Sequence, residues 1–286
     1  MSYANPDALV STEWLAEHLS APDVHVVDAS WYLPAMNRDP KAEYAEAHIP
    51  GAVYFDIDEI ADTNNPLPHM LPSPEKFSSR VRKLGLGDGV RIVVYDGIGL
   101  FSAARVWWMF RYFGHDDVAV LDGGLPKWRA EGRPLESLDP MPRDRHFTAR
   151  VNALLVRDFD QVKANIDSRR EQVLDARSAG RFAGAEPEPR AELRGGRIPG
   201  SLNLPFSEIV DPKSGTMKPA DDLRQAYEAA GVDFNRPVIT SCGSGVTASA
   251  LTLGLYLLGH RDVAVYDGSW TEWGGREDAP IETGGG

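Results

Sequence analysis

The chain contains one sequence pattern twice. HIPGAVYFDIDEI at residues 48–60 recurs as RIPGSLNLPFSEI at 197–209, and FGHDDVAVLDGGLPKW at 113–128 recurs as LGHRDVAVYDGSWTEW at 258–273. Two further matches, VVDAS with VLDAR and IVVYDGIGLFSAA with PVITSCGSGVTASA, keep the same order, and all offsets lie between 145 and 149 residues. Self-similarity of this kind indicates one structural unit used repeatedly. We therefore expect two copies of one domain.

Each copy alternates apolar, β-branched runs with helical stretches. Parallel strands need such crossover helices, so the pattern predicts an α/β fold in which each domain is a parallel sheet flanked by helices. Ligands of these sheets bind beyond the carboxyl ends of the strands. The residues expected at those ends are Asp28, Asp96 and Asp122 in the first copy and Asp175, Cys242 and Asp267 in the second.

The domain boundaries follow from composition. We place the first domain at residues 1–138, a linker at 139–153 and the second domain at 154–286. The stretch 132–153 that contains this linker is polar and includes three prolines, as is typical of connecting segments. The final residues, ETGGG, are expected to be disordered.

Charge and cysteine content exclude several classes of function. The formal net charge of −12 in 286 residues disfavours nucleic acid as a partner. No apolar stretch reaches the roughly 20 residues of a membrane helix, so we expect no membrane partner. The single cysteine excludes an internal disulfide, and the histidines show no metal-ligand spacing with it, so we expect no metal site. A free thiol suits a cytoplasmic location.

Cys242 stands where a strand turns into a helix. Residues 238–240 predict a buried strand and 247–258 an apolar helix, with Gly243 and Gly245 between them. Glycines let successive backbone N–H groups turn inward as an anion-binding nest, and the helix N-terminus adds partial positive charge there. This favours a thiolate, the nucleophilic form of cysteine. The alternative is that Cys242 is merely a small buried residue.

Two other kinds of site use similar loops. GSGVTA satisfies the dinucleotide pattern G-x-G-x-x-A, but only 41 residues follow Gly245, too few to complete a dinucleotide-binding fold. Cysteine phosphatases need an arginine six residues after the cysteine, where Ala248 stands. The first copy has Asp96 in place of Cys242. Because a carboxylate is not a sulfur nucleophile, we expect the first domain to be inert and to form one wall of the site.

The chain resembles the two-domain rhodanese-like sulfurtransferases through HIPGA, DGG followed by Trp, DARS…GRF…EPEPR and CGSGVTA. The resemblance implies transfer of sulfur from 3-mercaptopyruvate to a thiol or cyanide through a Cys242 persulfide, with release of pyruvate and no cofactor. Members that prefer thiosulfate usually carry basic residues where Gly243 and Ser244 stand here. A neutral loop suits mercaptopyruvate, which has a single carboxylate.

The resemblance also assigns site residues. It implies that Ser244 acts with Asp58 of the other domain and that His69 contacts the substrate. Without it, Asp58 would be a helix N-cap and His69 a surface residue. Arg181 and Arg190 match the carboxylate-binding arginines of the family, in keeping with the bidentate grip of a guanidinium; their alternative is pairing with Glu186, Glu188 or Asp175.

Other residues receive backbone or packing roles. We expect the loop amides to face the sulfur, which makes Gly243, Gly245, Val246 and Thr247 substrate-binding positions. Arg177, close to Asp175, is interpreted as a structural ion-pair partner. Trp128 and Trp273 occupy matching positions in the two copies, which indicates repeated core packing.

Two rival functions stay open at this point. One is thiosulfate:cyanide sulfur transfer by the same cysteine. The other is a non-catalytic binding module or persulfide carrier that docks a partner. The expected partners are a small-molecule sulfur donor and a thiol acceptor, for which thioredoxin is one candidate.

Overall fold

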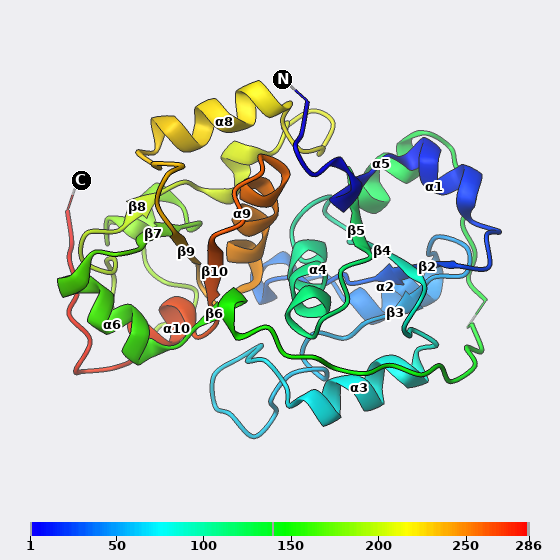
Figure 1. The fold of residues 1–286 in the computed structure, drawn as a ribbon, viewed down its shortest axis with the longest axis horizontal. Helices are drawn as coiled ribbons and strands as arrows, with labels where there is room; N and C mark the ends of the chain where they lie inside the picture. The colour runs from blue at the N-terminus through cyan, green and yellow to red at the C-terminus, as the bar shows by residue number, and fades with distance from the viewer. Residues whose placement is uncertain (1, 139, 285–286) are drawn as a thin grey trace.

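Two parallel sheets with the same strand order form the protein (Figure 1). The computed structural model describes residues 2–138 and 140–284. The first sheet has the order β1-β5-β4-β2-β3 and the second β6-β10-β9-β7-β8, and all strand pairs in these described residues are parallel. Each strand number in the second order is five higher than its counterpart in the first, so the two sheets have the same topology. The α/β fold and the duplication predicted from the sequence are therefore both confirmed.

The elements have these bounds. The strands are β1 (Leu9–Val10), β2 (Val24–Asp28), β3 (Val53–Tyr54), β4 (Arg91–Tyr95), β5 (Val118–Leu121), β6 (Val156–Arg157), β7 (Gln172–Asp175), β8 (Leu202–Asn203), β9 (Val238–Ser241) and β10 (Val263–Tyr266). The α-helices are α1 (Thr12–His18), α2 (Pro40–Glu46), α3 (Pro74–Lys83), α4 (Ala103–Tyr112), α5 (Gly124–Ala130), α6 (Phe159–Ser168), α7 (Ala179–Phe182), α8 (Ala220–Ala229), α9 (Val246–Leu257) and α10 (Ser269–Trp273). The 3-10 helices are η1 (Pro6–Ala8), η2 (Pro34–Met36), η3 (Ala153–Leu155) and η4 (Phe206–Ile209).

The central strands are buried on both faces, as expected of parallel strands covered by helices. In β4, Ile92 and Val94 belong to the large core, whereas Val93 and Tyr95 belong to a smaller cluster on the other face of the sheet. This alternation follows the two-residue period of a strand. The central strands therefore appear in the sequence as apolar runs because their side chains are buried on both faces of the sheet.

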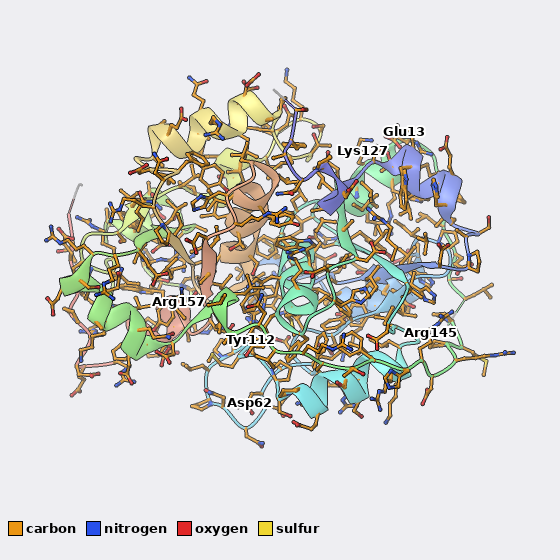
Figure 2. All side chains as sticks on the ribbon, viewed as in Figure 1. Glu13, Asp62, Tyr112, Lys127, Arg145 and Arg157 are labelled. Atoms are coloured by element: carbon orange, nitrogen blue, oxygen red, sulfur yellow. The ribbon has the colours of Figure 1, made fainter. Side chains whose placement is uncertain are left out.

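One hydrophobic core continues across the domain boundary. Helix α4 of the first domain and helix α9 of the second lie side by side (Figure 1). Trp107 from α4 and Leu251 from α9 belong to the same buried cluster, and Figure 2 shows side chains occupying the space between the two ribbons. The two domains are therefore joined by packing as well as by the linker.

The repeated tryptophans have the structural role predicted for them. Trp128 and Trp273 are fully buried, in the smaller clusters of the first and second sheets. Trp128 Nε1 donates to the Pro134 carbonyl at 2.8 Å, and Trp273 Nε1 donates to the Pro280 carbonyl at 2.8 Å. The duplication thus extends to single hydrogen bonds.

The segment after the first domain and the tail of the chain are both packed against the domains. The segment 140–153 packs along the first domain, where Phe147 is buried and its carbonyl accepts from Arg82 Nη2 at 2.8 Å. The prediction of a disordered tail is wrong for residues 282–284, since Glu282 pairs with Arg197 and Gly284 N–H donates to the Ala183 carbonyl. Residues 285 and 286 lie outside the described part. Within that part, no helix has the length and apolar character needed to cross a membrane.

Candidate active site

Cys242 lies directly after β9, at the carboxyl edge of the second sheet, as predicted. Gly245 is the N-cap of α9 and adopts the left-handed conformation, with φ of 79°. A Cβ added at Gly245 would lie 2.9 Å from Arg105 Nη1 and 3.0 Å from the Asp267 carbonyl oxygen. Only glycine meets both conditions, a positive φ and no side chain. The loop therefore connects Cys242, at the end of β9, to the N-terminus of the buried helix α9.

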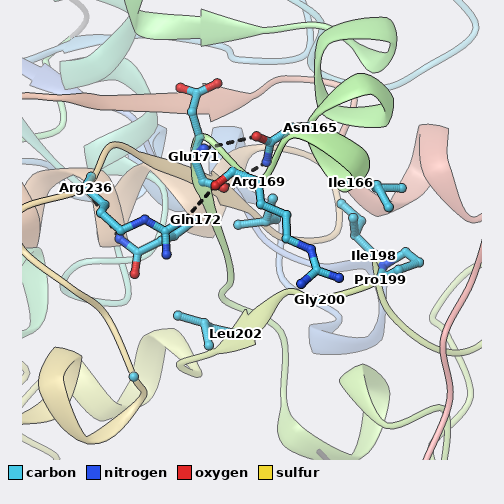
Figure 3. Close-up of a pocket in the computed structure, with 12 residues that line it drawn as sticks. Asn165, Ile166, Arg169, Glu171, Gln172, Ile198, Pro199, Gly200, Leu202 and Arg236 are labelled. Carbon is cyan, nitrogen blue, oxygen red and sulfur yellow. Dashed lines mark hydrogen bonds between the residues drawn. The ribbon is translucent and has the colours of Figure 1, made fainter.

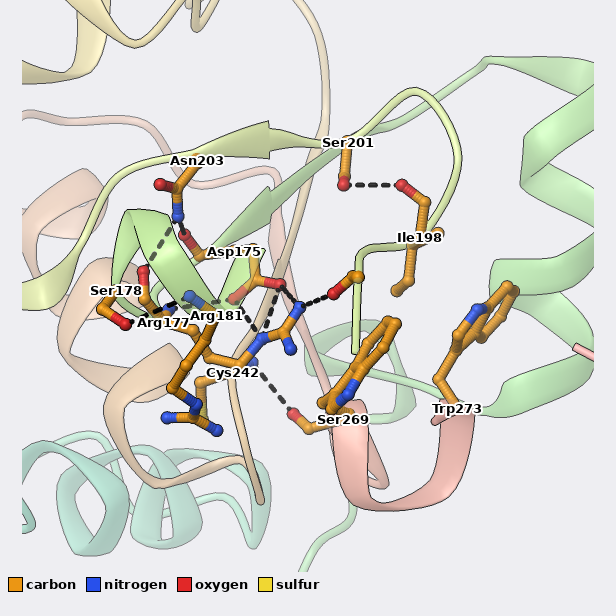
Figure 4. Close-up of polar contacts among 12 residues, drawn as sticks. Asp175, Arg177, Ser178, Arg181, Ile198, Ser201, Asn203, Cys242, Ser269 and Trp273 are labelled. Atoms are coloured by element: carbon orange, nitrogen blue, oxygen red, sulfur yellow. Dashed lines mark hydrogen bonds and ion pairs between the residues drawn. The ribbon is translucent and has the colours of Figure 1, made fainter. Parts of the chain in front are cut away.

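Helix α10 fixes the backbone of this loop (Figure 4). Cys242 N–H donates to Ser269 Oγ at 3.2 Å, and its carbonyl accepts from Trp270 N–H at 2.9 Å. The Gly243 carbonyl accepts from Thr271 N–H at 2.8 Å and from Thr271 Oγ1 at 2.6 Å. Cys242 is only 2% exposed, so a donor must be small to reach it.

Ser269 is a site residue that the sequence analysis missed. It has a φ of 48°, which is unusual for a residue other than glycine. The equivalent residue of the first copy, 145 positions earlier, is Gly124 with a φ of 52°. Replacement of glycine by serine at a left-handed position costs free energy, and here it supplies the hydroxyl that contacts the Cys242 amide. This replacement of glycine by serine between the two repeats is the sequence signal that could have identified Ser269 as a site residue.

Asp58, His69 and Ser244 form a hydrogen-bonded series across the domain boundary. His69 Nε2 lies 2.9 Å from Asp58 Oδ1, and His69 Nδ1 lies 3.0 Å from Ser244 Oγ. The ring of His69 is buried, whereas the Asp58 side chain is 61% exposed. A carboxylate, an imidazole and a hydroxyl in this order form a path along which a proton can move.

Trp31 supports this series from the first domain, and the sequence analysis did not single it out. Its Nε1 donates to Asp58 Oδ2 at 3.0 Å, and its ring meets the His69 ring edge-on, with centroids 4.7 Å apart. Burial alone would raise the pKa of Asp58, but the hydrogen bond and charge of His69, together with the Trp31 hydrogen bond, outweigh burial and lower that pKa. Asp58 is therefore held as a carboxylate beside the imidazole.

Two alternative interpretations of these residues are wrong. Asp58 is not a helix N-cap, because the Asp56 carboxylate accepts the N–H groups of Asp58 and Glu59 in a turn. His69 is not a surface residue, since it is 5% exposed in the folded chain. The cause is local for Asp58, whereas His69 is buried because the second domain, through Ser244 and its loop, packs against it.

Arg181 lies beside the catalytic loop and is held there by Glu188. Its Nε and Nη2 approach Glu188 Oε2 at 3.1 and 2.5 Å, and a Cβ on Gly243 would lie 3.3 Å from Nη2. The guanidinium is 21% exposed and the Glu188 side chain 1%. The ion-pair interpretation is correct for Glu188, and the same contact points Arg181 toward the loop. Glu188 was considered only as an ion-pair partner, not as a site residue.

Arg177 and Arg190 complete the basic surroundings. Arg177 is buried and pairs with Asp175 and with the second oxygen of Glu188, each at 2.7 Å, which confirms its structural role. Arg190 Nη1 lies 3.4 Å from Thr271 Oγ1, the hydroxyl that binds the Gly243 carbonyl. Arg181 and Arg190 therefore both border the loop that contains Cys242.

In the first copy, the loop that is equivalent to the Cys242 loop binds a negatively charged side chain through its backbone amides. The Asp96 carboxylate accepts five backbone N–H groups of its own loop at 2.7 to 2.9 Å, from Ile98, Gly99, Phe101, Ser102 and Ala103. Inward-facing amides of this kind are an anion nest. Cys242 occupies the equivalent position in a loop one residue shorter, which supports the predicted role of the amides at Gly243, Gly245, Val246 and Thr247.

A separate hollow of about 330 Å³ lies in the second domain (Figure 3). Gln172, Leu202 and Arg236 line it, at or before the starts of β7, β8 and β9. It is therefore at the amino edge of the sheet, opposite the edge at which Cys242 lies, and takes no part in the site described above.

In residues 2–138 and 140–284, no three His, Cys, Asp or Glu side chains converge as metal ligands.

Comparisons with known proteins agree with the duplicated fold. The rhodanese-like domain matches residues 11–131 and 158–276. The chain is 45% identical to human 3-mercaptopyruvate sulfurtransferase, over 93% of this chain and 91% of that protein. It is 46% identical to bovine thiosulfate sulfurtransferase, over 96% of this chain and 94% of that protein. The crystal structure of SseA from Escherichia coli, described as a 3-mercaptopyruvate sulfurtransferase structure, superposes with a TM-score of 0.85 at 40% identity, covering 92% of this chain and 98% of that one.

Proposed function

The chain belongs to the family of rhodanese-like sulfurtransferases, and from this premise we propose that it transfers sulfur from 3-mercaptopyruvate through a persulfide on Cys242. The observation that supports this most directly is the position of Cys242, at a loop whose counterpart in the first domain holds a carboxylate with five amides. A loop that stabilises one anion at this position stabilises a thiolate and a persulfide anion as well.

In the first step, the Cys242 thiolate attacks the sulfur of mercaptopyruvate. A sulfur–sulfur bond forms and the carbon–sulfur bond of the donor breaks, with its electron pair passing to the carbon as the enolate of pyruvate. The enolate then takes up one proton to give pyruvate, and Cys242 remains as a persulfide. We infer that the hydroxyl of Ser244 supplies that proton, and this is supported by its contact with His69 at 3.0 Å and by the contact of His69 with Asp58 at 2.9 Å.

The two arginines that border the loop are suited to bind the carboxylate of the donor. Arg181 and Arg190 border Gly243, and a guanidinium donates strong, charge-assisted hydrogen bonds to a carboxylate. Thiosulfate is the alternative donor, since similar chains are named for it. Comparison of kcat/KM for the two donors separates these functions. Replacing Gly243 by Arg and Ser244 by Lys should shift that preference toward thiosulfate.

Intact mass measurement tests the covalent step. Incubation of the purified chain with mercaptopyruvate should add one sulfur atom and release pyruvate, and Cys242→Ser should do neither. The matched control is Asp96→Asn, which alters the equivalent position of the inert domain and should leave pyruvate release intact. A wild-type chain that gains no sulfur and releases no pyruvate would instead be a binding module.

For the second step, we propose a thiol as the acceptor of the outer sulfur. Reduced thioredoxin is the first candidate, in keeping with a cytoplasmic location for a chain with a single cysteine, which the structure shows as a free thiol. The sulfur-loaded chain should lose its added mass when reduced thioredoxin is supplied. Loss to cyanide but not to thioredoxin would contradict this choice of acceptor.

A further inference from the structure

We propose that Arg105 and Asp267 are a positioning pair that holds His69 in the conformation in which it links Asp58 to Ser244. This inference rests on the proposed function, because the linked groups are the proposed proton path. Arg105 belongs to α4 of the first domain, and Asp267 follows β10 of the second. The pair therefore spans the same domain boundary as the proton path itself.

The pair contacts the backbone directly after the His69 side chain, at the His69 carbonyl and the Leu71 amide. Arg105 Nη1 lies 2.7 Å from Asp267 Oδ1, and the two side chains are 0% and 6% exposed. Arg105 Nη2 donates to the His69 carbonyl at 2.5 Å. Asp267 Oδ2 accepts from Leu71 N–H at 2.7 Å. Two charged groups thus fix the carbonyl of His69 and the amide two residues later.

His69 needs such restraint because its backbone is left-handed, with φ of 62°. For a residue with a Cβ, this conformation costs roughly 1–2 kcal/mol. Such residues persist only where their surroundings impose the conformation. A return to negative φ would turn the imidazole away from Asp58 and Ser244, both of which it meets at 3.0 Å or less.

The equivalent contact between the two domains, at the inert site, provides an internal comparison. Asp122, equivalent to Asp267, accepts across the boundary from Met217 N–H at 2.7 Å, just as Asp267 does from Leu71. The residue equivalent to His69, at an offset of 146, is Gly215, which is also left-handed with φ of 70°. Glycine adopts this conformation freely.

The arginine is present only on the side with the histidine. At the offset of 145 that relates Asp122 to Asp267, the counterpart of Arg105 is Ala250. At the inert site, the carboxylate therefore contacts the other domain without an arginine partner from α9. A fully buried charge is expensive to desolvate, and Arg105 Nε has no hydrogen-bond partner among the described residues. Domain docking does not explain Arg105, whereas the restraint of a left-handed histidine does.

A double-mutant cycle tests the proposal. Arg105→Met should lower kcat for pyruvate release about 10²-fold, the effect of roughly 1 Å of misplacement. In a His69→Gly chain, which has lost the imidazole and tolerates positive φ, Arg105→Met should cause almost no further loss. Equal losses in both backgrounds would overturn the proposal, because they would mean that Arg105 acts on structure in general. Asp122→Asn is the matched control and should leave kcat unchanged.

Two further measurements cover failure to fold and failure of the proposed function. Circular dichroism shows whether Arg105→Met is folded. If it is not, the double variant Arg105→Met, Asp267→Asn replaces it in the same cycle, because this variant removes both charges and keeps an acceptor for Leu71 N–H. The NMR resonances of the His69 ring should shift in whichever variant is folded. If the His69 resonances shift in the variant but the wild-type chain releases no pyruvate, the proposed function is wrong and the positioning role stands. If the His69 resonances do not shift, the positioning role is wrong.

Discussion

Arg181→Ala tests how the site recognises its donor. The substrate carboxylate keeps its charge through the reaction, so a group that binds it stabilises the ground state and the transition state alike. Removal of the guanidinium should therefore raise KM for mercaptopyruvate and leave kcat nearly unchanged. The backbone of α7, which places Arg181 beside Gly243, is retained in this variant.

The magnitude follows from the contacts that Arg181 already makes. Its Nε and Nη2 approach Glu188 Oε2, which leaves Nη1 to meet a carboxylate. One hydrogen bond to a charged group contributes about 1.5–3 kcal/mol, equivalent to a rise in KM of about 10- to 150-fold. The change also removes one partner of the buried Glu188, whose other oxygen stays paired with Arg177, so a loss of about 1–3 kcal/mol in the free energy of unfolding should accompany it.

Steady-state kinetics of pyruvate release measure this effect, and thermal unfolding shows that the variant is folded at the assay temperature. Arg224→Ala is the control, because Arg224 pairs with Glu228 on the surface of α8 and should change neither KM nor kcat. A folded Arg181→Ala chain with an unchanged KM would refute the assignment of Arg181 to carboxylate binding.

Three further substitutions test other contacts. Ser244→Ala ends the proton path and should lower kcat for pyruvate release by roughly 10²- to 10⁴-fold; an unchanged kcat would place the proton source elsewhere. Ser269→Gly removes the cost of a left-handed serine but also removes the acceptor of Cys242 N–H. We expect kcat/KM to fall about tenfold, while the free energy of unfolding changes by about 1 kcal/mol or less. A kcat/KM equal to that of the wild type would mean that α10 does not position the cysteine. Burial raises the pKa of Asp122 from 3.8 to about 6 despite the Met217 N–H and the Lys127 charge, so its contribution to stability is full below about pH 4 and is lost as pH rises through about 6. Asp122→Asn should therefore stabilise the chain by up to about 3 kcal/mol at pH 8 and hardly at pH 4 in denaturant titrations, whereas a gain independent of pH would contradict the shift.

The sequence alone determined the architecture. The repeat established two domains, and the apolar runs established parallel strands buried on both faces, because strand burial is recorded residue by residue in a local pattern. The position of Cys242 between β9 and α9 followed from the same local reasoning. The roles of Asp58 and His69 did not, since they came from the family resemblance, and the residues themselves suggested an N-cap and a surface histidine.

Only the tertiary structure decided how the site is assembled. His69 and Ser244 are 175 residues apart in the chain and 3.0 Å apart in space, and Arg105 reaches Asp267 across the same boundary at 2.7 Å. Ser269 and Glu188 likewise contact the site through packing and not through sequence spacing. Periodicity reports which face of an element is buried, but the partner on that face depends on how two complete domains pack together, and local sequence contains no record of that.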